Sequence, residues 1–258
     1  MKRSFFNRQS AAVTLLHAPE TVAEAVAVAR NAEMDGADAV ALELHRMPRE
    51  ERSVENFQQV IRSVQLPFMF IDYRYDVAFG SDDDARQESL MMAVDAGAEV
   101  VDVIGDLYDP SPRELTVNPE AIEKQKALIA RIHERGGKAL MSSHMPTEAL
   151  KAEEVLAHLQ EQSSRGADIL KIVVKVDSEE ECVEAVRTML LLHRSLNKPY
   201  IYLASGRFSR FIRYIGPKFG VAVEFGVHDY SERSSYFQPT IKSFQNVLQN
   251  MHWDIENG

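Results

Sequence analysis

A short phrase recurs along the chain and constrains the fold more than any other feature. Gly-Ala followed by an acidic residue stands between a helical pattern and an apolar run at Gly36, Gly97 and Gly166, and Gly136-Gly137 stands at a fourth such junction. A glycine just past a helix takes the left-handed conformation that ends the helix, and the next residues enter a strand. Repeated helix–glycine–strand junctions predict αβ units around a parallel sheet.

Apolar runs alternate with helical patterns over the whole sequence. We expect eight strands, over Ala11–Leu16, Ala39–Leu44, Phe68–Tyr73, Val100–Ile104, Ala139–Ser143, Ile169–Val174, Tyr200–Ala204 and Val221–Phe225. Eight strands with intervening helices predict a (β/α)8 TIM barrel. A doubly wound sheet is less favoured, because no Gly-x-Gly-x-x-Gly follows the first strand and no Walker loop occurs. No linker appears, so residues 1–258 are expected to form a single barrel domain.

A lysine interrupts one of the apolar runs. Lys171 lies within Ile169–Val174, which has the pattern of a strand buried on both faces. Burial of an unpaired ammonium group is costly and is usually relieved by loss of the proton. A neutral amine on a rigid strand is what imine chemistry requires. The alternative is a strand-end lysine that reaches solvent or pairs with a carboxylate.

Polar residues also stand at the ends of other runs, where barrel active sites lie. His144 follows the fifth run and is a candidate for proton transfer near neutral pH, or else a loop histidine bonded to the backbone. Asp72 and Arg74 are two residues apart and so are expected on one face. They form either a structural ion pair inside the barrel mouth or, at Arg74, an anion site.

Basic residues gather after the seventh run. Arg207, Arg210 and Arg213 recur every three residues, so a helical turn would place them along one side. In a chain with a net charge of −10, such a cluster predicts a carboxylate or phosphate site. The alternative is a solvated helix face, which fits Arg207 and Arg210 better than Arg213.

The remaining polar stretch of interest follows the eighth run. The loop His228–Gln238 contains Ser234 and Gln238 just before the last helical pattern. We interpret this loop as a lid over the pocket.

Composition argues against several classes of partner and location. The net charge of −10 disfavours nucleic acid and anionic membranes as partners, and no stretch approaches the roughly 18 apolar residues of a membrane span. The single Cys182 excludes an intrachain disulfide and fits a reducing compartment. The first ten residues lack the continuous apolar core of a secretion signal, so we expect a cytoplasmic protein. No metal is expected, because the histidines near strand ends lack a local ligand spacing (His17, His45, His144 and His228).

Five segments follow one another in a recognisable order. They are Phe70-Ile-Asp-Tyr-Arg74, Met141-Ser-Ser-His144, Ala167-Asp-Ile-Leu-Lys-Ile172, Arg213-Tyr-Ile-Gly-Pro-Lys-Phe-Gly220 and Ser234-x-x-x-Gln238. Together they resemble the type I 3-dehydroquinate dehydratase family, the Schiff-base (β/α)8 lyases of the shikimate pathway and of aromatic amino acid biosynthesis. The resemblance extends over almost the whole chain.

The resemblance implies a role for each segment. It implies that Lys171 forms the imine with the substrate and that His144 is the general acid and base. It further implies substrate-facing roles for Arg213, which would hold the carboxylate, and, with an altered spacing, for Arg74. Ser234 and Gln238 would belong to a loop that closes over the substrate. Neither cofactor nor metal is implied.

The second strand departs from the family pattern. The family has Glu-x-Arg-x-Asp there, and the aligned positions are Ala41, Glu43 and His45. A slip of two residues makes Glu43 the substrate-binding glutamate but leaves the arginine absent. The glycine-rich acidic loop of the third strand is also replaced, by Val77-Ala-Phe-Gly80. The resemblance therefore covers the imine and carboxylate sides of the site better than the side that binds substrate hydroxyls.

We expect a hydro-lyase that converts 3-dehydroquinate, a small anionic carboxylate, to 3-dehydroshikimate. One alternative is an imine-forming lyase or aldolase that acts on a different carboxylated ketone, because loss of hydroxyl-binding groups changes specificity more readily than it changes imine chemistry. The other is a non-catalytic barrel that binds a carboxylate ligand, and the presence of both Lys171 and His144 argues against it. A homodimer is compatible with a barrel of this size, although no segment indicates an interface.

Overall fold

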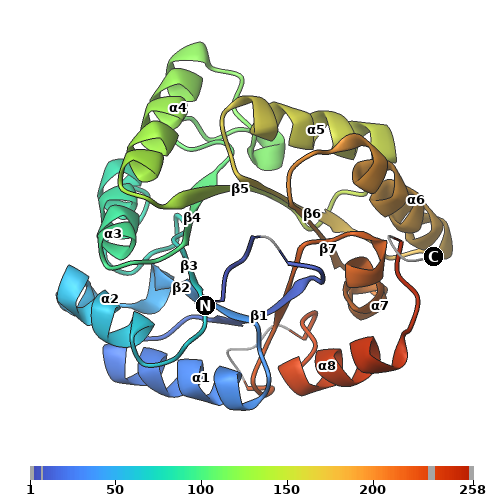
Figure 1. The fold of residues 1–258 in the computed structure, drawn as a ribbon. Helices are drawn as coiled ribbons and strands as arrows, with labels where there is room; N and C mark the ends of the chain where they lie inside the picture. The colour runs from blue at the N-terminus through green and yellow to red at the C-terminus, as the bar shows by residue number, and fades with distance from the viewer. Residues whose placement is uncertain (1–2, 7, 232–235, 256–258) are drawn as a thin grey trace.

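The expected strands curve into one barrel surrounded by helices (Figure 1). A computed structural model describes residues 3–6, 8–231 and 236–255. The strands are β1 (Ala12–His17), β2 (Ala39–Glu43), β3 (Phe68–Ile71), β4 (Val100–Ile104), β5 (Lys138–Met145), β6 (Ile169–Lys175), β7 (Tyr200–Ser205) and β8 (Val223–Gly226). The α-helices are α1 (Val22–Met34), α2 (Val54–Ile61), α3 (Asp83–Asp95), α4 (Pro119–Glu134), α5 (Ala152–Ser164), α6 (Glu179–Ser195), α7 (Ser209–Ile215) and α8 (Ile241–Asn250).

The order of the strands confirms the (β/α)8 class. The sheet runs β7-β6-β5-β4-β3-β2-β1-β8, and its neighbouring strands pair in parallel. The two outer strands approach each other where the amide of Ala222 donates to the carbonyl of Tyr200 at 2.9 Å, so the barrel is nearly closed. All eight predicted strands are present, with ends that differ by a few residues. The extent of the single domain stays a prediction.

Side chains alternate between the inside of the barrel and the helix layer. Met69 and Ile71 of β3 pack in the inner apolar cluster, whereas Phe68 and Phe70 belong to the outer cluster beneath the helices. This is the period of two that a strand imposes. Every second residue of each strand therefore points to the centre of the barrel. The last inward-pointing residue of each strand lies at the carboxyl end of the barrel.

Glycines end the helices where the sequence predicts. Gly36, Gly97, Gly136 and Gly166 have φ values of 84°, 102°, 83° and 101°, in the left-handed region that glycine adopts without strain. None of the helices in the described ranges is both long and apolar enough to cross a membrane.

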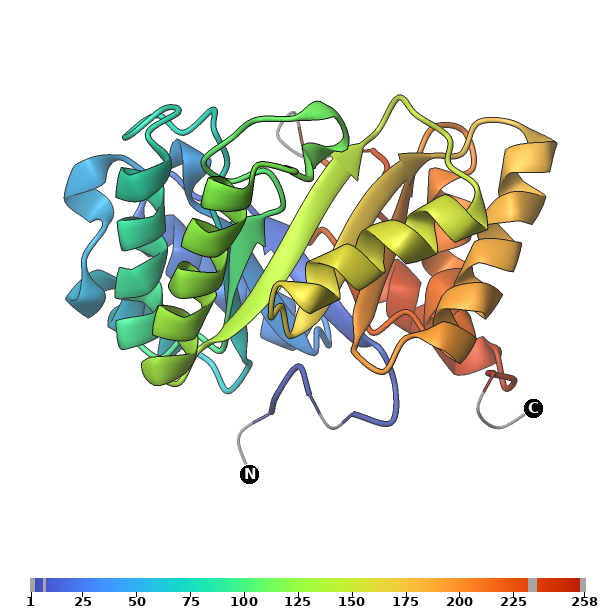
Figure 2. The ribbon, with the colours of Figure 1, turned by 90° about the horizontal axis from the view of Figure 1, so that it is seen from above.

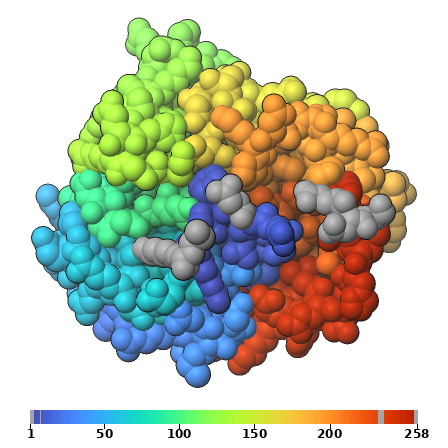
Figure 3. Space-filling view, viewed as in Figure 1, coloured from blue at the N-terminus to red at the C-terminus, as the bar shows by residue number. Residues whose placement is uncertain are grey.

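The N-terminal segment covers the amino end of the barrel. Phe5 is buried against the inner apolar cluster, and its amide donates to Glu99 Oε2 at 3.0 Å. Figure 2 shows this segment passing beneath the strands, and Figure 3 shows it lying across the opening of the barrel. Access to the barrel interior is therefore from the carboxyl ends of the strands.

A buried arginine joins the loops that follow β2 and β3. Arg52 Nη1 contacts Asp72 Oδ2 at 2.9 Å and Asp76 Oδ2 at 2.7 Å, and its Nε donates to the carbonyl of Met47 at 3.0 Å. All three charged residues are at least nine-tenths buried. Asp72 is thus paired with Arg52 and not, as the sequence suggested, with Arg74.

Arg52→Ala is expected to lower the free energy of unfolding by about 3–5 kcal/mol, because it removes the arginine that pairs with the buried Asp76 carboxylate and with Asp72. Arg49 is the matched control: it is exposed on the adjoining turn and lies over the ring of Phe79. Arg49→Ala should cost less than about 1 kcal/mol. Urea unfolding followed by circular dichroism measures both, and equal losses would contradict a structural role for the Arg52 network.

Candidate active site

Lys171 points into the barrel from the middle of β6. Its neighbours Ile169 and Val173 pack with the inner cluster, and the lysine is 4% exposed. Gln162 of α5 fixes the backbone at this point, since its Oε1 accepts from the Lys171 amide at 3.1 Å and its Nε2 donates to the Lys171 carbonyl at 3.0 Å. The amine therefore stands on a rigid support.

Three side chains meet at the Lys171 amine. His144, which faces inward from β5, places Nε2 3.0 Å from Lys171 Nζ. Tyr73, just past β3, places its hydroxyl 3.0 Å from Nζ and 3.1 Å from His144 Nε2. The structure thus brings together the predicted pair Lys171 and His144 and adds a phenol between them.

Glu114 orients the histidine. It lies on the short turn η3 (Pro112–Glu114), and its Oε2 contacts His144 Nδ1 at 2.7 Å and accepts from the His144 amide at 2.9 Å. The backbone φ of Glu114 is 45°, which is unfavourable for a residue other than glycine. Ser143 helps hold this conformation, because its hydroxyl donates to the Glu114 carbonyl at 2.8 Å.

Two further carboxyl groups face Lys171 from β4 and β2. Asp102 Oδ2 accepts from the Ser142 hydroxyl at 2.9 Å and lies 3.4 Å from the Tyr73 hydroxyl. Burial raises the pKa of Asp102, and burial likewise raises the pKa of Glu43, to about 7. Glu43 was predicted to bind substrate; the structure places it at the inner end of β2, and that role stays a prediction.

The pKa values of the central pair are both lowered. Burial lowers the pKa of Lys171, against the opposing influence of the nearby carboxylates of Asp102, Glu43 and Glu114. Burial also lowers the pKa of His144, and the charge of Lys171 acts in the same direction. Both groups are therefore closer to their neutral forms than in solution, and a neutral amine next to a neutral imidazole is a nucleophile next to a base.

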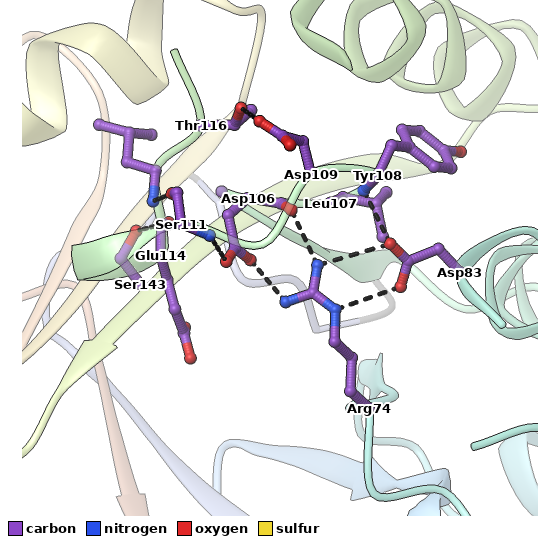
Figure 4. A network of polar contacts seen from close by, with 12 residues as sticks. Arg74, Asp83, Asp106, Leu107, Tyr108, Asp109, Ser111, Glu114, Thr116 and Ser143 are labelled. Atoms are coloured by element: carbon purple, nitrogen blue, oxygen red, sulfur yellow. Dashed lines mark hydrogen bonds and ion pairs between the residues drawn. The ribbon is translucent and has the colours of Figure 1, made fainter. Parts of the chain in front are cut away.

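Arg74 is held by the carboxylates of Asp106 and Asp83 (Figure 4). Its Nη1 contacts Asp106 Oδ1 at 2.8 Å, its Nη2 donates to the Asp106 carbonyl at 2.8 Å, and its Nε contacts Asp83 Oδ1 at 3.3 Å. The interpretation of Asp72 and Arg74 as an inward-facing pair is wrong. Phe68 and Phe70, on the same face of the chain as Asp72 and Arg74, point outward to the helix layer, whereas Tyr73 packs against the inner cluster. The substrate contact predicted for Arg74 stays a prediction that this geometry does not favour.

The three arginines after β7 do not form one cluster. Arg207 pairs with Glu179 and Arg210 donates from Nε to the carbonyl of Tyr236 at 2.8 Å, and both are exposed, as a solvated face requires. Arg213 is 5% exposed, and its Nε and Nη1 have no hydrogen-bond partner among the described residues.

Glu224 is an acidic neighbour of Arg213 in the helix layer. Glu224 on the outer face of β8 is fully buried, and burial raises its pKa well above the usual range. Its oxygens have no hydrogen-bond partner within the described part of the chain. The charge of Arg213 reaches the centre, because it contributes to lowering the pKa of Lys171. A buried guanidinium with unused donors is suited to binding an anion.

The predicted lid is described only in part. Gln238 is half-buried and lies two residues before Thr240, which bridges to Val227 just past β8. Ser234 lies outside the described residues. The closing role of this loop stays a prediction.

Within the described ranges, no group of three or more His, Cys, Asp or Glu side chains is arranged to hold a metal ion. Sequence reasoning missed two residues of this site, Tyr73 and Glu114. It also did not assign the Asp102 carboxylate to the site. Asp102 could have been found from its charge within an apolar strand, and Tyr73 from the alternation along β3. Glu114 carries no such signal, because only the folded turn brings it to His144.

Comparison with known proteins places this arrangement in a family. The sequence profile of type I 3-dehydroquinase matches residues 13–254. The chain is 27% identical over 128 residues to a 3-dehydroquinate dehydratase of Alkaliphilus oremlandii, covering 49% of each chain. It is 28% identical over 210 residues to a chloroplastic bifunctional 3-dehydroquinate dehydratase/shikimate dehydrogenase of Arabidopsis thaliana, covering 80% of this chain and 32% of that one. The matches therefore span about half or less of these curated relatives.

Solved structures agree on the fold. The 3-dehydroquinate dehydratase of Geobacillus kaustophilus superimposes with a TM-score of 0.80 at 18% identity, over 93% of this chain and 91% of that one. The type I enzyme of Clostridium difficile gives a TM-score of 0.77 at 17% identity, over 94% and 92% of the two chains. With a sequence profile that matches nearly the whole chain and a barrel that carries its lysine and histidine side by side, this protein belongs to the type I 3-dehydroquinase family.

Proposed function

We propose that the protein dehydrates 3-dehydroquinate to 3-dehydroshikimate through an imine on Lys171. The observation that carries this proposal is the contact of 3.0 Å between the buried Lys171 Nζ and His144 Nε2. The names of the relatives support the substrate, since they are 3-dehydroquinate dehydratases. The Clostridium difficile protein, described with covalently modified comenic acid, supports covalent chemistry in a barrel of this kind.

The reaction uses the two central residues in turn. Lys171 Nζ attacks the ketone carbon and, after loss of water, forms a protonated imine that withdraws electrons from the adjacent carbon. His144 Nε2 takes the proton from that carbon, and the C–H electron pair forms the new double bond as the hydroxyl group leaves. The imidazolium returns the proton to the departing hydroxyl, so that water is released. Hydrolysis of the imine frees the product and Lys171.

Arg213 is proposed to hold the substrate carboxylate. It is the buried arginine whose Nε and Nη1 lack partners in the described part of the chain, and its charge acts on Lys171. Because its neighbour Glu224 has a raised pKa, Arg213 is not fully compensated before substrate binds. Arg74 is already occupied by Asp83 and Asp106, so we assign it to supporting the loop that bears Glu114.

The residues at the carboxyl end of β2 support a second candidate function. At the carboxyl end of β2, Glu43 lies next to His45, and burial lowers the pKa of His45 to about 4, so the histidine is neutral. A substrate with fewer hydroxyl groups would fit this side equally well. The second candidate is an imine-forming lyase or aldolase that acts on a different carboxylated ketone.

The test is incubation with 3-dehydroquinate and borohydride, followed by intact-protein and peptide mass spectrometry, with ultraviolet absorbance of the conjugated product measured in parallel. An adduct on Lys171 together with product supports the dehydratase. An adduct without product would favour a different carboxylated ketone. Absence of both would overturn the proposal.

We also propose a cytoplasmic enzyme of the shikimate pathway. The support is the single Cys182, which suits a reducing compartment, and the established family. We further propose a homodimer, which is compatible with a barrel of this size. Analytical ultracentrifugation of the purified protein, which measures its mass in solution, tests this.

Asp102→Asn is expected to move the pH profile of Lys171 reactivity to lower pH. The Asp102 carboxylate raises the pKa of Lys171, so its removal lowers that pKa and makes the neutral amine available under more acidic conditions. Reductive methylation of Lys171 by formaldehyde and cyanoborohydride, quantified by peptide mass spectrometry across pH, measures the midpoint. Asp84→Asn, at an exposed position paired with Lys124, should leave the midpoint unchanged. A midpoint at or above that of the wild type would contradict the expectation.

A further inference from the structure

The hydroxyl of Tyr73 contacts both Lys171 and His144. Its oxygen lies 3.0 Å from Lys171 Nζ and 3.1 Å from His144 Nε2, and these two nitrogens are themselves 3.0 Å apart. The ring stands edge-on to the imidazole, with centroids 5.1 Å apart and an interplanar angle of 88°. The Tyr73 hydroxyl is therefore within hydrogen-bonding distance of both the nucleophile and the base.

The partner of the other imidazole nitrogen fixes the direction of these hydrogen bonds. His144 Nδ1 faces the Glu114 carboxylate, which can only accept, so the neutral ring carries its hydrogen on Nδ1. Nε2 is then an acceptor. Lys171 Nζ donates to the Tyr73 oxygen, and the Tyr73 hydroxyl donates to Nε2. The second acceptor near the hydroxyl, Asp102 Oδ2, is farther away, at 3.4 Å.

This chain of hydrogen bonds joins the base to the atom on which the imine forms. We propose that Tyr73 is a catalytic residue that passes a proton from His144 to the hydroxyl of the carbinolamine formed on Lys171. The assignment rests on the imine chemistry proposed above, but it does not depend on which ketone is the natural substrate.

The step balances without an external reactant. The Lys171 ammonium first gives one proton to His144 Nε2, 3.0 Å away, which leaves a neutral amine beside an imidazolium. Lys171 Nζ then bonds to the carbonyl carbon, a second proton passes from the nitrogen to the carbonyl oxygen, and the carbinolamine results. As the C–O bond breaks with its electron pair, the oxygen takes the phenol proton and leaves as water. The nitrogen lone pair forms the C=N bond. The phenol oxygen takes the Nε2 proton of the His144 imidazolium, so Tyr73 is restored and His144 becomes neutral.

The surroundings of Tyr73 favour a protonated phenol that relays protons over a phenolate that is present in the resting enzyme. Burial raises the pKa of Tyr73, and the charge of Asp102 acts in the same direction, so the phenol keeps its proton in the resting enzyme. It gives up that proton only as it receives another from His144. Both protons therefore move in one step. The number of protons that move can be measured from the dependence of the rate on the deuterium content of the solvent.

The test measures imine formation at Lys171 with formaldehyde as the carbonyl probe and excess cyanoborohydride as the trap, resolved by peptide mass spectrometry. Tyr73→Phe removes the hydroxyl and keeps the ring. The plateau rate at Lys171 is expected to fall about 10²-fold, at the lower end of general acid catalysis. Tyr75→Phe is the matched control on the same loop, where the tyrosine is 64% exposed, and its rate should equal that of the wild type.

Two measurements separate a proton donor from a structural residue. If Tyr73 only set the pKa of Lys171, Tyr73→Phe would shift the pH profile and keep the plateau, and that result would overturn the proposal. In mixtures of H2O and D2O, the wild-type rate should depend on deuterium content with the curvature of two moving protons, whereas Tyr73→Phe should lose that curvature. A linear wild-type dependence would also overturn the relay. Because the probe is formaldehyde, these results stand apart from the assay with 3-dehydroquinate, whose failure would concern the substrate alone.

Discussion

Lys171→Ala is expected to abolish both the borohydride-trapped adduct and the release of 3-dehydroshikimate. The amine is the nucleophile of the proposed reaction, and it is the group that His144, Tyr73 and Asp102 surround. Loss of a covalent nucleophile lowers turnover by about 10⁴–10⁶-fold in enzymes where it has been measured. Steady-state absorbance and peptide mass spectrometry on the same sample give the two readouts.

Lys171→Arg should be equally inactive, although it retains a positive charge. A guanidinium stays protonated and cannot attack a ketone. This variant separates nucleophilic from electrostatic catalysis, because a purely electrostatic role would leave it with much of the wild-type rate.

Lys175→Ala is the matched control for both variants. Lys175 ends the same strand, four residues further on, and its Nζ lies 3.5 Å from Glu181 at the protein surface. Its removal should leave adduct and product unchanged. Turnover by Lys171→Ala at the wild-type rate would end the imine mechanism and return the non-catalytic barrel to consideration.

Much of the fold follows from local signals that tertiary structure does not override. Gly36, Gly97 and Gly166 have the positive φ that their place after a helix requires, and the apolar runs behind them become strands of the barrel. Lys171 and His144 were selected for a related reason: a titratable group within an apolar strand, or at the carboxyl end of one in a barrel, is a candidate for chemistry.

The missed residues show where such signals end. The alternation along β3 places Tyr73 on the inner face, but only its distances to Lys171 and His144 distinguish it from a residue of the core. Arg74 drew attention because it is charged, yet the alternation along β3 turns it toward Asp83 and Asp106. Charge at a strand end is therefore a weaker guide than the face on which the residue lies.

Glu114 could not be predicted because its position depends on contacts distant in sequence. Ser111 and Asp106 hold the turn, through the amide of Ser111 and Asp106 Oδ2 at 2.8 Å, and Arg74 holds Asp106 in turn (Figure 4). Ser143 adds the bond to the Glu114 carbonyl. A carboxylate that reaches its histidine through such a set of tertiary bonds leaves no pattern in the sequence.

His144→Ala is expected to slow imine formation on Lys171, because the relay loses its proton source, but to lower turnover more, by about 10³-fold, within the range of general acid and base catalysis. The imidazole is the base that takes the proton from the carbon next to the imine, and its Nε2 is 3.0 Å from the imine nitrogen position. The intermediate should therefore accumulate. Borohydride added during turnover should trap a larger fraction of the variant than of the wild type, while product absorbance rises slowly.

Glu114→Gln tests the same assignment through the orientation and charge of the ring. The Glu114 carboxylate raises the pKa of His144 relative to burial alone, so the amide should lower that pKa and extend the base form to lower pH. The acidic limb of kcat/KM is then expected to move to lower pH, with a smaller loss of turnover than in His144→Ala. His133→Ala, on α4 and paired with Asp168, should change neither the limb nor the rate. If His144→Ala trapped no more imine than the wild type, or if its turnover were unchanged, the rate-limiting proton would be carried by another group, and Glu43, with its pKa near 7, would be the next to replace.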